Sequence, residues 1–414
     1  MPLDTAGRQP LAPDTPDALT DIVRAAAADG TPLDLMGSGT RRALGRPVTA
    51  NARTVSLRGL SGVREYSPTE LYITVGAGTP VAEVTAALAE KGQGLLFEPP
   101  DLCALLGSTG QPTIGGAVAT GFAGPARIAG GGIRDSLIGV ELVTGRAEAI
   151  RSGGKVMKNV TGYDLTKLMI GAFGTLGALT EVTFKVLPTP RRTATLAVRG
   201  LADAQARELM SLALASPYEV TGAAHLPAGL AARCGVAQLA DGASTLLRLG
   251  GFAESIDYRV GELTDHLDTS AQIDVLDDAA SATVWTGVRD VRPLAGAESR
   301  APDRAVWRIS VKPTDGPEVV ARLADLAPDA LYDWGGGLVW LAVDAGSDAA
   351  APAVRAAAGA AGGTAMLVRA PDGVRATVPF QAPPAGALAA VVARLREAFD
   401  PAGVLNPGRL YPET

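Results

Sequence analysis

The chain has 414 residues, of which 47% are hydrophobic and 19% charged, and its formal net charge is −6. This composition is that of a soluble globular protein, and the length exceeds what one hydrophobic core usually serves, so we expect two domains. The acidic balance argues against a nucleic-acid-binding protein, which needs a basic face, and 4% aromatic residues offer few platforms for stacking bases.

Cysteine usage and hydropathy narrow the class of protein further. Cys103 and Cys234 are the two cysteines, and they have no metal-ligand spacing, so a disulfide framework is excluded. The first residues lack the apolar core of a signal peptide, and no apolar run approaches the roughly 18 residues of a spanning helix. We therefore expect a cytoplasmic protein without a transmembrane segment.

The first predicted elements alternate between helix and strand, which indicates an α/β unit. Thr15 before Pro16 favours the start of a helix, and Gly30 favours its end. The pattern then predicts a short strand at 33–36, strands at 53–57 and 71–80, and a helix over 80–91.

The loop after the first strand, MGSGTRR at 36–42, is rich in glycine, hydroxyl and arginine residues. A Rossmann fingerprint needs Gly-x-Gly-x-x-Gly followed by a helix. Gly37 and Gly39 fit the first two positions, but Arg42 stands at the third and Pro47 leaves no room for the helix. The two glycines still let several backbone N–H groups face one side. The loop is therefore either a phosphate site of another kind or an exposed basic turn.

From residue 95 to 187 we expect short strands and glycine-rich turns, with one helix at about 163–171. Strands or turns are predicted at 95–100, 112–125, 136–145, 153–159 and 177–190. The pair Gly115–Gly116 lies in an apolar segment, where adjacent glycines weaken strands and helices alike. Such a pair suits a backbone that passes close to a flat ligand, and a glycine-rich turn in a buried core is the alternative.

Pro188 and Pro190, followed by two arginines, mark a domain boundary. Beyond it, strands predicted at 244–252, 305–313 and 337–346 alternate with alanine-rich helices. This pattern indicates an α+β domain around a mainly antiparallel sheet. The tail is predicted to be a helix that ends near Asp400, followed by a turn rich in proline and glycine.

Three segments together resemble the FAD-binding domain of the vanillyl-alcohol oxidase / p-cresol methylhydroxylase (PCMH) superfamily. They are the loop at 37–41, TIGGAVATGFAGP at 113–125 and GGKVMKNVTGYDL at 153–165. The resemblance covers about residues 10–190 and the tail segment FDPAGVLNPGR. With FEPP and GGIRDSLIGVELVTG, these segments are similar to the family of FAD-binding E subunits of bacterial glycolate oxidases.

The resemblance implies an α+β fold with a two-subdomain PCMH-type FAD-binding domain over 1–190. An α+β cap domain with a mainly antiparallel sheet would follow over 191–394, and a tail over 395–414 would return to the first domain. Many relatives carry a flavin-linking histidine at or near the position of Thr40. Because this chain has no histidine there, we expect FAD to be bound non-covalently.

The resemblance also implies which residues contact FAD. The pyrophosphate loop would comprise Gly37, Ser38, Gly39, Thr40 and Arg41. The diphosphate and the flavin edge would be lined by Gly110, Gln111, Thr113, Gly115, Gly116, Ala119 and Thr120. Asp135 would lie near the cofactor, Val182 at the adenine side and Asn406 near the isoalloxazine. Lys158 and Asn159 are further candidates, for which a solvated turn is the alternative.

Relatives that oxidise 2-hydroxy acids use a catalytic histidine, a His-rich divalent-metal site and an arginine that binds the carboxylate. This chain has two histidines, His225, expected in a loop, and His266, expected at a helix end. We therefore expect no metal site and name no catalytic residue.

Three other features have open interpretations. Trp334 and Trp340 flank three glycines and could pack over the flavin, against another chain or in the core. Arg308 and Lys312 are expected on a solvated strand face, with anion binding as the alternative. Cys103 is expected to be a buried small hydrophobic residue.

The function implied by the resemblance is that of the FAD-binding subunit of a glycolate oxidase complex, which oxidises glycolate to glyoxylate. Its partners would be a larger, metal-bearing flavoprotein subunit and an iron–sulfur subunit, with no nucleic acid. The flavin would serve as an electron relay or as a structural element, and peripheral membrane association through the complex is left open. The alternatives are a self-sufficient FAD-dependent oxidoreductase that acts on an alcohol or aldehyde, and a non-catalytic scaffold subunit.

Overall fold

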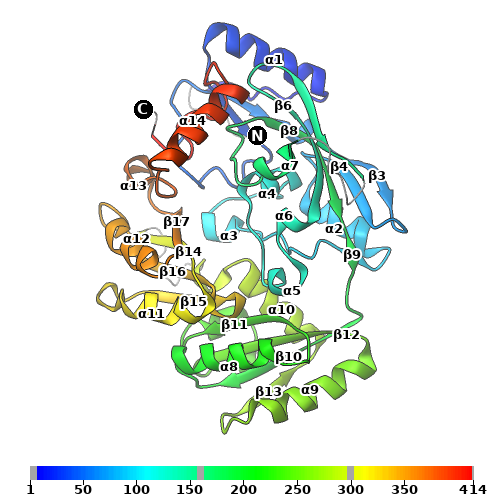
Figure 1. The fold of residues 1–414 in the computed structure, drawn as a ribbon, viewed down its shortest axis with the longest axis vertical. Helices are drawn as coiled ribbons and strands as arrows, with labels where there is room; N and C mark the ends of the chain where they lie inside the picture. The colour runs from blue at the N-terminus through cyan, green and yellow to red at the C-terminus, as the bar shows by residue number, and fades with distance from the viewer. Residues whose placement is uncertain (1–6, 156–162, 296–302, 413–414) are drawn as a thin grey trace.

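The computed structural model describes residues 7–155, 163–295 and 303–412, and it shows an upper and a lower part in Figure 1. The N-terminal half of the chain and helix α14 (Ala387–Phe399) form the upper part, and the residues between them form the lower part. The boundary predicted at 190 falls between β9 (Leu187–Pro188) and β10 (Arg192–Arg199). The boundary predicted at 394 falls inside α14, and the division into domains stays a prediction.

The upper part begins with a helix that packs on a two-stranded parallel sheet. Helix α1 (Pro16–Asp29) begins and ends as predicted, because the Thr15 side chain accepts a hydrogen bond from Ala18 N at 3.2 Å and Gly30 adopts φ +64°. Strand β1 (Leu33–Met36) pairs in parallel with β2 (Arg53–Ser56). The apolar stripe of α1 packs in a common core with these strands.

The larger sheet of the upper part is antiparallel, with the strand order β3-β4-β8-β6-β7. Its strands are β3 (Val63–Ser67), β4 (Tyr72–Gly76), β6 (Leu137–Val143), β7 (Ala149–Gly153) and β8 (Ala178–Lys185). The helices around it are α2 (Val81–Ala89), α3 (Cys103–Leu106), α4 (Ile114–Thr120), α5 (Arg127–Gly130), α6 (Ile133–Ser136) and α7 (Leu165–Leu168). The segment 95–100, predicted as a strand or a turn, contains a turn at 96–97. The short strand β5 (Gln93–Gly94) lies just before it and pairs with β9, and the prolines at 99 and 100 lack the N–H that a ladder needs.

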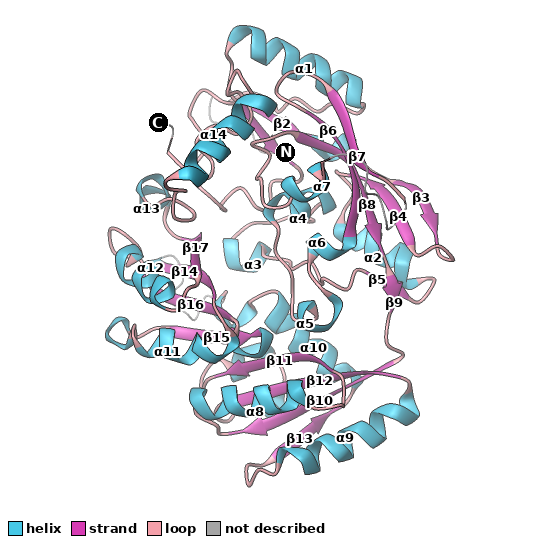
Figure 2. Cartoon of the chain, in the orientation of Figure 1, coloured by secondary structure: helices cyan, strands magenta, loops and turns pink. Residues whose placement is uncertain are grey.

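The lower part contains one antiparallel sheet of eight strands, which confirms the α+β fold with a mainly antiparallel second sheet. The strand order is β13-β10-β12-β11-β15-β16-β14-β17. The remaining strands are β11 (Val220–Leu226), β12 (Ser244–Gly251), β13 (Ile273–Leu276), β14 (Arg304–Ser310), β15 (Asp329–Asp333), β16 (Leu338–Asp344) and β17 (Thr364–Arg369). The helices are α8 (Asp203–Ala215), α9 (Ala253–Leu267), α10 (Asp278–Arg289), α11 (Gly316–Ala321), α12 (Ala351–Ala360) and α13 (Asp372–Thr377), with α8 and α9 in front of the sheet in Figure 2.

The two halves of this sheet meet where His225 on β11 pairs with Tyr332 on β15. His225 is fully buried; its Nδ1 lies 2.9 Å from Thr245 Oγ1 and its Nε2 lies 3.4 Å from Asp203 Oδ1. The Tyr332 hydroxyl donates to the same carboxylate, and the bonds from His225 and Tyr332 lower the pKa of Asp203 although burial opposes this. The loop predicted for His225 is therefore wrong, because the residue belongs to a buried strand.

The inner face of the eight-stranded sheet packs against the upper part in one shared core. Side chains alternate along a strand, so Trp307 on β14 faces the outer helices while Arg308 faces inward. Arg308 is only 9% exposed, so the solvated face predicted for it is wrong, and Lys312 lies beyond the end of β14. Trp340 is buried and meets Phe122 of the upper part edge-on, with ring centroids 6.1 Å apart.

Hydrogen bonds also connect the two parts. Three side chains of the lower part donate to backbone carbonyls of the upper part: Trp334 Nε1 to Gly124 O at 3.0 Å, Arg369 Nη1 to Leu105 O at 3.3 Å, and Arg375 Nη1 to Gly45 O at 2.7 Å. Next to Trp334, the Asp333 carboxylate is 2% exposed and accepts a hydrogen bond from Trp334 N at 2.7 Å. Burial raises the pKa of Asp333 to about 7.

We predict that Asp333 makes folding stability depend on pH. The folded chain holds a proton on Asp333 that the unfolded chain releases between about pH 4 and pH 7, so the free energy of unfolding should fall as the pH rises through this window. Each pKa unit corresponds to about 1.4 kcal/mol, so wild type should lose about 2 kcal/mol relative to Asp333→Asn between pH 5 and pH 7. Chemical denaturation at pH 5, 6, 7 and 8 measures the difference.

Asp325→Asn, a change at an exposed carboxyl, is the matched control and should leave the pH slope of wild type unchanged. Parallel pH profiles for wild type and Asp333→Asn would show that the Asp333 carboxyl is already ionised below pH 5.

Candidate functional site

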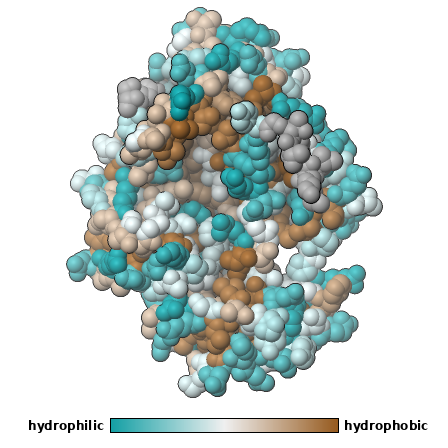
Figure 3. Space-filling model, in the orientation of Figure 1, coloured by the Kyte–Doolittle hydropathy of each residue, from teal (hydrophilic) through white to brown (hydrophobic). Residues whose placement is uncertain are grey.

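A cleft lies between the loop after β1, helix α4 and the C-terminal tail. In the space-filling view of Figure 3, the surface is hollowed near its centre. The cleft brings together eleven of the fifteen residues predicted to contact FAD. They are Gly37, Ser38, Gly39, Thr40, Arg41, Thr113, Gly115, Gly116, Ala119, Thr120 and Asn406.

The walls of the cleft approach one another at glycines. A Cβ atom added at Gly37 would lie 2.1 Å from Thr113 Oγ1, which is far inside van der Waals contact. A Cβ atom at Gly115 would lie 2.7 Å from the carbonyl oxygen of Ala77, so α4 could not pack on the strand region beside β4 with a larger residue there. The glycines are therefore needed for the packing that forms the cleft.

The loop from Gly37 to Arg41 presents unused backbone donors to the cleft. Among the described residues, none of its five backbone N–H groups donates a hydrogen bond to the protein. Its carbonyls are held instead, because Ser56 Oγ donates to Gly37 O at 3.2 Å and Ser108 Oγ donates to Thr40 O at 2.8 Å. A fixed loop whose N–H groups lack protein partners is the cradle that a diphosphate requires.

The segment at 112–125 forms a helix where we expected short strands and turns, so that expectation is wrong. Thr113 supplies the helix cap, because its Oγ1 accepts a hydrogen bond from Gly116 N at 3.3 Å, and Gly121 ends α4 at φ +73°. The first N–H groups of the helix are used by the protein, since Ile114 N donates to Thr79 O and Gly115 N to Ala77 O. Donors for a ligand therefore come from the loop after β1 and not from the end of α4.

Arg41 is the cationic group of the cleft wall. Its guanidinium donates to Thr120 Oγ1 and, at 2.7 Å, to Pro100 O, and these two bonds hold the guanidinium in one orientation. Burial lowers the pKa of Arg41 to about 10, which the nearby Asp101 carboxylate partly offsets, and the group stays charged at neutral pH. A fixed, poorly solvated cation favours an anionic ligand in the cleft.

Two further arginines hold the same loop, and the sequence analysis did not identify them as site residues. Arg42 pairs with the buried Asp34 carboxylate on β1. Arg409, from the tail, donates to Arg42 O at 2.6 Å and to Arg46 O at 2.7 Å. Both line the cleft, as do Phe173 and Gly174. The only sequence signal for Arg409 was its place three residues after Asn406.

Asn406 joins three segments that are distant in sequence. Its Oδ1 accepts from Leu35 N on β1 at 2.7 Å, and its Nδ2 donates to Phe173 O at 2.6 Å. The side chain also lies where a Cβ atom at Gly174 would be, at 2.7 Å from Nδ2. Two of the four hydrogen-bonding positions of the amide are thus used to assemble the cleft, which leaves one N–H and one lone pair of Oδ1 for a ligand.

Four predicted contact residues do not line the cleft. Gly110 and Gln111 lie beside it, and Gln111 O accepts from Ser38 Oγ at 2.5 Å. Asp135 is exposed and caps α6 by accepting from Gly132 N at 2.7 Å, and Val182 is fully buried in the middle of the sheet on β8. Their roles toward FAD stay predictions, and Lys158 and Asn159 lie outside the described residues.

The histidines lie away from the cleft, His225 in the lower sheet and His266 on α9. In the ranges that the structure describes, no group of three or more His, Cys, Asp or Glu side chains is arranged to hold a metal ion. Cys103 is only partly buried, which differs from the buried residue we expected, and burial raises its pKa to about 11. No described helix is both long enough and apolar enough to cross a membrane.

Comparisons with known proteins agree with this architecture. A family model described as an FAD-binding domain matches residues 9–153. The glycolate oxidase subunit GlcE of Escherichia coli (strain K12) is 35% identical over 401 residues, which cover 97% of this chain and 98% of that protein. The glycolate oxidase subunit GlcD of Bacillus subtilis (strain 168) is 33% identical over 45% of this chain and 38% of its own length.

Solved structures show the same fold. p-Cresol methylhydroxylase with substrate bound has a TM-score of 0.68 at 14% identity, covering 96% of this chain and 87% of that chain. Alkyldihydroxyacetonephosphate synthase has a TM-score of 0.65 at 17% identity, covering 96% of this chain and 76% of that chain. At these identities the likeness concerns the fold alone.

We predict that Gly116→Val abolishes FAD retention. A Cβ atom at Gly116 meets only Thr113 Oγ1, at 3.1 Å, so the valine side chain would project into the cleft and leave the core intact. Purified variant protein should be folded and carry less than about a tenth of the wild-type flavin, because a ligand cannot share the volume of the side chain. Absorbance of the purified protein measures the flavin content.

Gly261→Val on α9 is the matched control, since a Cβ atom there meets nothing within 4 Å. It should retain full flavin content. A yellow Gly116→Val protein with wild-type flavin would place the cofactor elsewhere.

We predict that Asn406→Asp weakens both the fold and FAD retention. A carboxylate cannot donate to Phe173 O and would place negative charge against that carbonyl, while aspartate still tolerates the left-handed φ of +45° found here. The free energy of unfolding should fall by about 1–3 kcal/mol, as measured by chemical denaturation.

Asn51→Asp, in an exposed turn, makes the same chemical change and should alter neither stability nor flavin content. Equal behaviour of the two variants would mean that the Asn406 amide does not hold the cleft together.

Proposed function

The chain belongs to the family of the glycolate oxidase subunit GlcE, and we propose that it is the FAD-binding subunit of a glycolate oxidase complex. This complex would oxidise glycolate to glyoxylate together with a larger, GlcD-like flavoprotein subunit and an iron–sulfur subunit. Similarity to GlcE over 97% of this chain and 98% of GlcE supports the assignment of the whole chain to this subunit. Similarity to GlcD covers only 45% of this chain. Two different flavoprotein chains in one complex fit this pattern.

The observation that carries the proposal is the loop Gly37–Arg41, with five backbone N–H groups that lack protein partners in the described structure. Such a row of donors suits the pyrophosphate of a dinucleotide, and the glycines beside it let a planar group approach the backbone. These features fit FAD, which supplies the redox chemistry when it is bound. Arg41, Thr113 and Asn406 would orient it from three sides of the cleft.

We propose that FAD is held without a covalent bond. Thr40 lies in the wall of the cleft, at or near the position where many relatives would carry a linking histidine, and a threonine does not form that link. The two histidines of the chain lie in the lower part, one buried against Asp203 and Thr245 and the other on the exposed side of α9. Neither is near the cleft.

The position of the two histidines away from the cleft favours a supporting role for this chain in catalysis. A base for the hydroxy acid has to reach the substrate through the cleft, and neither histidine does so. We therefore propose that the larger subunit carries the substrate chemistry, and that this chain holds a second flavin as a relay or as a structural element.

The test is to purify the chain alone and in the complex with its two partners. Acid precipitation should release intact FAD into the supernatant. The isolated chain should be yellow and should not reduce a dye acceptor with glycolate or D-lactate, with or without a divalent metal ion. The assembled complex should do so, and His266→Ala in this chain should leave its activity within about twofold of wild type, since ordinary surface substitutions have small effects.

Three outcomes would overturn parts of this proposal. Flavin that stays with the precipitated protein contradicts non-covalent binding. Turnover of glycolate by the isolated chain makes it a self-sufficient oxidoreductase. A colourless chain that still assembles into an active complex makes it a scaffold.

A further inference from the structure

A large groove lies between the upper and the lower part, beside the linker from β9 to β10, which runs down the right-hand side of Figure 1. Its walls are formed by β5 and α5 of the upper part, by the linker, and by β12 and α10 of the lower part. No described residue lines both this groove and the cofactor cleft. Its volume of about 1060 Å³ is at the upper end of the range for ligand pockets, so a small hydroxy acid would fill little of it.

Glycines leave the backbone accessible along the walls of the groove. Five of them line it: Gly92, Gly94, Gly130, Gly250 and Gly251. Because glycine has no side chain, another polypeptide backbone can approach the chain closely at these positions. The groove therefore suits an extended segment of polypeptide.

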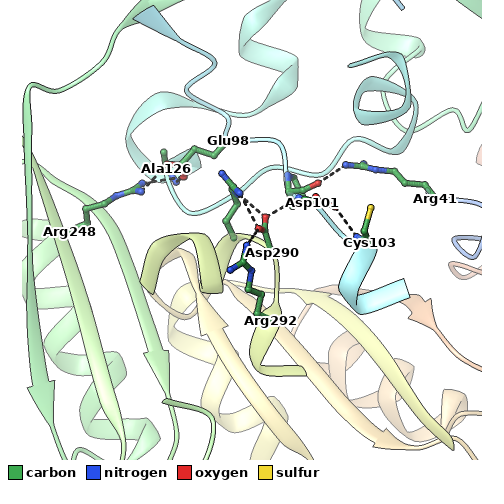
Figure 4. A network of polar contacts seen from close by, with 10 residues as sticks. Arg41, Glu98, Asp101, Cys103, Ala126, Arg248, Asp290 and Arg292 are labelled. Carbon is green, nitrogen blue, oxygen red and sulfur yellow. Dashed lines mark hydrogen bonds and ion pairs between the residues drawn. The ribbon is translucent and has the colours of Figure 1, made fainter. Parts of the chain in front are cut away.

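The less exposed charged groups of the groove have partners within the chain. Figure 4 shows that Arg248 on β12 faces Glu98, with Nη1 to Oε1 at 2.8 Å and Nη2 to Oε2 at 3.2 Å. On α10, Arg289 Nε donates to Asp290 Oδ1 at 2.7 Å. The Asp278 carboxylate accepts from a backbone N–H of β10 at 2.6 Å. These charges are compensated, as the low dielectric between two packed parts requires.

Two cations that line the groove lack such partners. Lys91, just after α2, and Arg191, in the linker, are both exposed. Within the described ranges neither side chain makes a hydrogen bond or an ion pair, and Arg191 lies 5.5 Å from the ring of Phe252. The groove therefore carries excess positive charge on a chain whose net charge is −6. Four cationic and two anionic side chains line it: Lys91, Arg191, Arg248, Arg289, Glu98 and Asp278.

Phe252 adds an exposed aromatic ring to the groove. The chain has seven phenylalanines, of which five are buried, whereas Phe252 is 64% exposed. It immediately precedes α9, and Arg191 stacks against it. Aromatic and arginine side chains are enriched among the residues that dominate binding at protein–protein interfaces. The groove thus combines an apolar anchor with unpaired cations.

We propose that this groove receives an extended acidic segment of a partner subunit. Carboxylates of the segment would pair with Lys91 and Arg191, and an apolar side chain beside them would pack on Phe252. Arginine clusters bind acidic segments in this way, because each guanidinium donates to a carboxylate in a fixed geometry. That the segment belongs to a subunit of a glycolate oxidase complex rests on the proposed function, whereas its acidic character rests on the charge of the groove.

The first experiment is isothermal titration calorimetry of the full-length chain with its two partner subunits, purified without it. The affinity of wild type should fall as the salt concentration rises, because salt screens pairs of exposed charges. Arg191→Glu should weaken binding at least about tenfold at low salt, since like charges would then face one another. Lys312→Glu makes the same charge change at an exposed residue outside the groove, so it is the matched control and should bind like wild type.

The aromatic anchor has its own pair of variants. Phe252→Ala should weaken binding at least about tenfold, as truncation of a central aromatic contact does. Tyr163→Ala removes a ring that is 93% exposed and lies outside the groove, and it should leave binding unchanged. Because every substituted side chain is exposed, all variants should keep the Tm and the flavin content of wild type.

Carbodiimide cross-linking tests the acidic contact directly. The reagent activates a carboxylate, the lysine amine then forms an amide bond with it, and the displaced oxygen leaves on the reagent as a urea. In the complex, Lys91 should be coupled to an aspartate or glutamate of a partner subunit, as identified by mass spectrometry of the cross-linked peptides. Lys91→Arg should lose this cross-link and keep the affinity of wild type, because arginine retains the charge.

The outcomes separate this inference from the proposed function. Partner subunits that do not bind wild type at all would overturn both. Partner subunits that bind Arg191→Glu and Phe252→Ala as tightly as wild type, with no cross-link from Lys91, would overturn this inference alone. Loss of binding in Phe252→Ala without any dependence on salt would overturn the acidic character of the segment. A cross-link from Lys91 to a second copy of this chain would overturn its assignment to a partner subunit.

Discussion

The cleft depends on one close approach, between the backbone at Gly37 and the side chain of Thr113. A Cβ atom at Gly37 would lie 2.1 Å from Thr113 Oγ1, and that oxygen also caps helix α4. The loop after β1 and the start of α4 are therefore positioned by the same threonine. With the loop pressed against the helix, two of its carbonyls bond Ser56 and Ser108, and its N–H groups have no protein partner among the described residues. The geometry of the donors thus follows from a packing constraint that only glycine meets.

The site is assembled from both ends of the chain, so it exists only when the chain has folded as a whole. Asn406 bonds Leu35, 371 residues earlier in the sequence, and Arg409 holds the carbonyls of Arg42 and Arg46. From the lower part, Arg375 donates to Gly45 in the same loop. Ordering a loop of this length costs conformational entropy. Arginines that bond its carbonyls offset that cost without using the N–H groups that a ligand needs.

Features with a local cause could be predicted from the sequence, and features with a distant cause could not. The cap at Thr15, the strands β1, β2, β14 and β16 and the helix end near Asp400 follow from nearby residues, and the glycine-rich loops suggested the cleft through their resemblance to a family. Helix α4 was missed because Gly115 and Gly116 weaken a helix in isolation, and the packing against Ala77 that requires Gly115 comes from a segment distant in sequence. The burial of Arg308 and the strand position of His225 depend on partners that are distant in sequence, and the sequence did not indicate that the Asn406 amide would bond the backbone of Leu35 and Phe173.

The buried arginines between the two parts of the chain differ in how their charge is compensated. Arg369 and Arg375 bond carbonyls, and Arg248 bonds a carboxylate, so each recovers part of the solvation it loses. Replacing a buried ion pair with apolar residues is often neutral for stability, whereas a buried charge without a partner is strongly unfavourable. In the described structure Arg308 makes only its contacts with the rings of Phe122 and Trp334, so its guanidinium recovers less of the solvation that it loses.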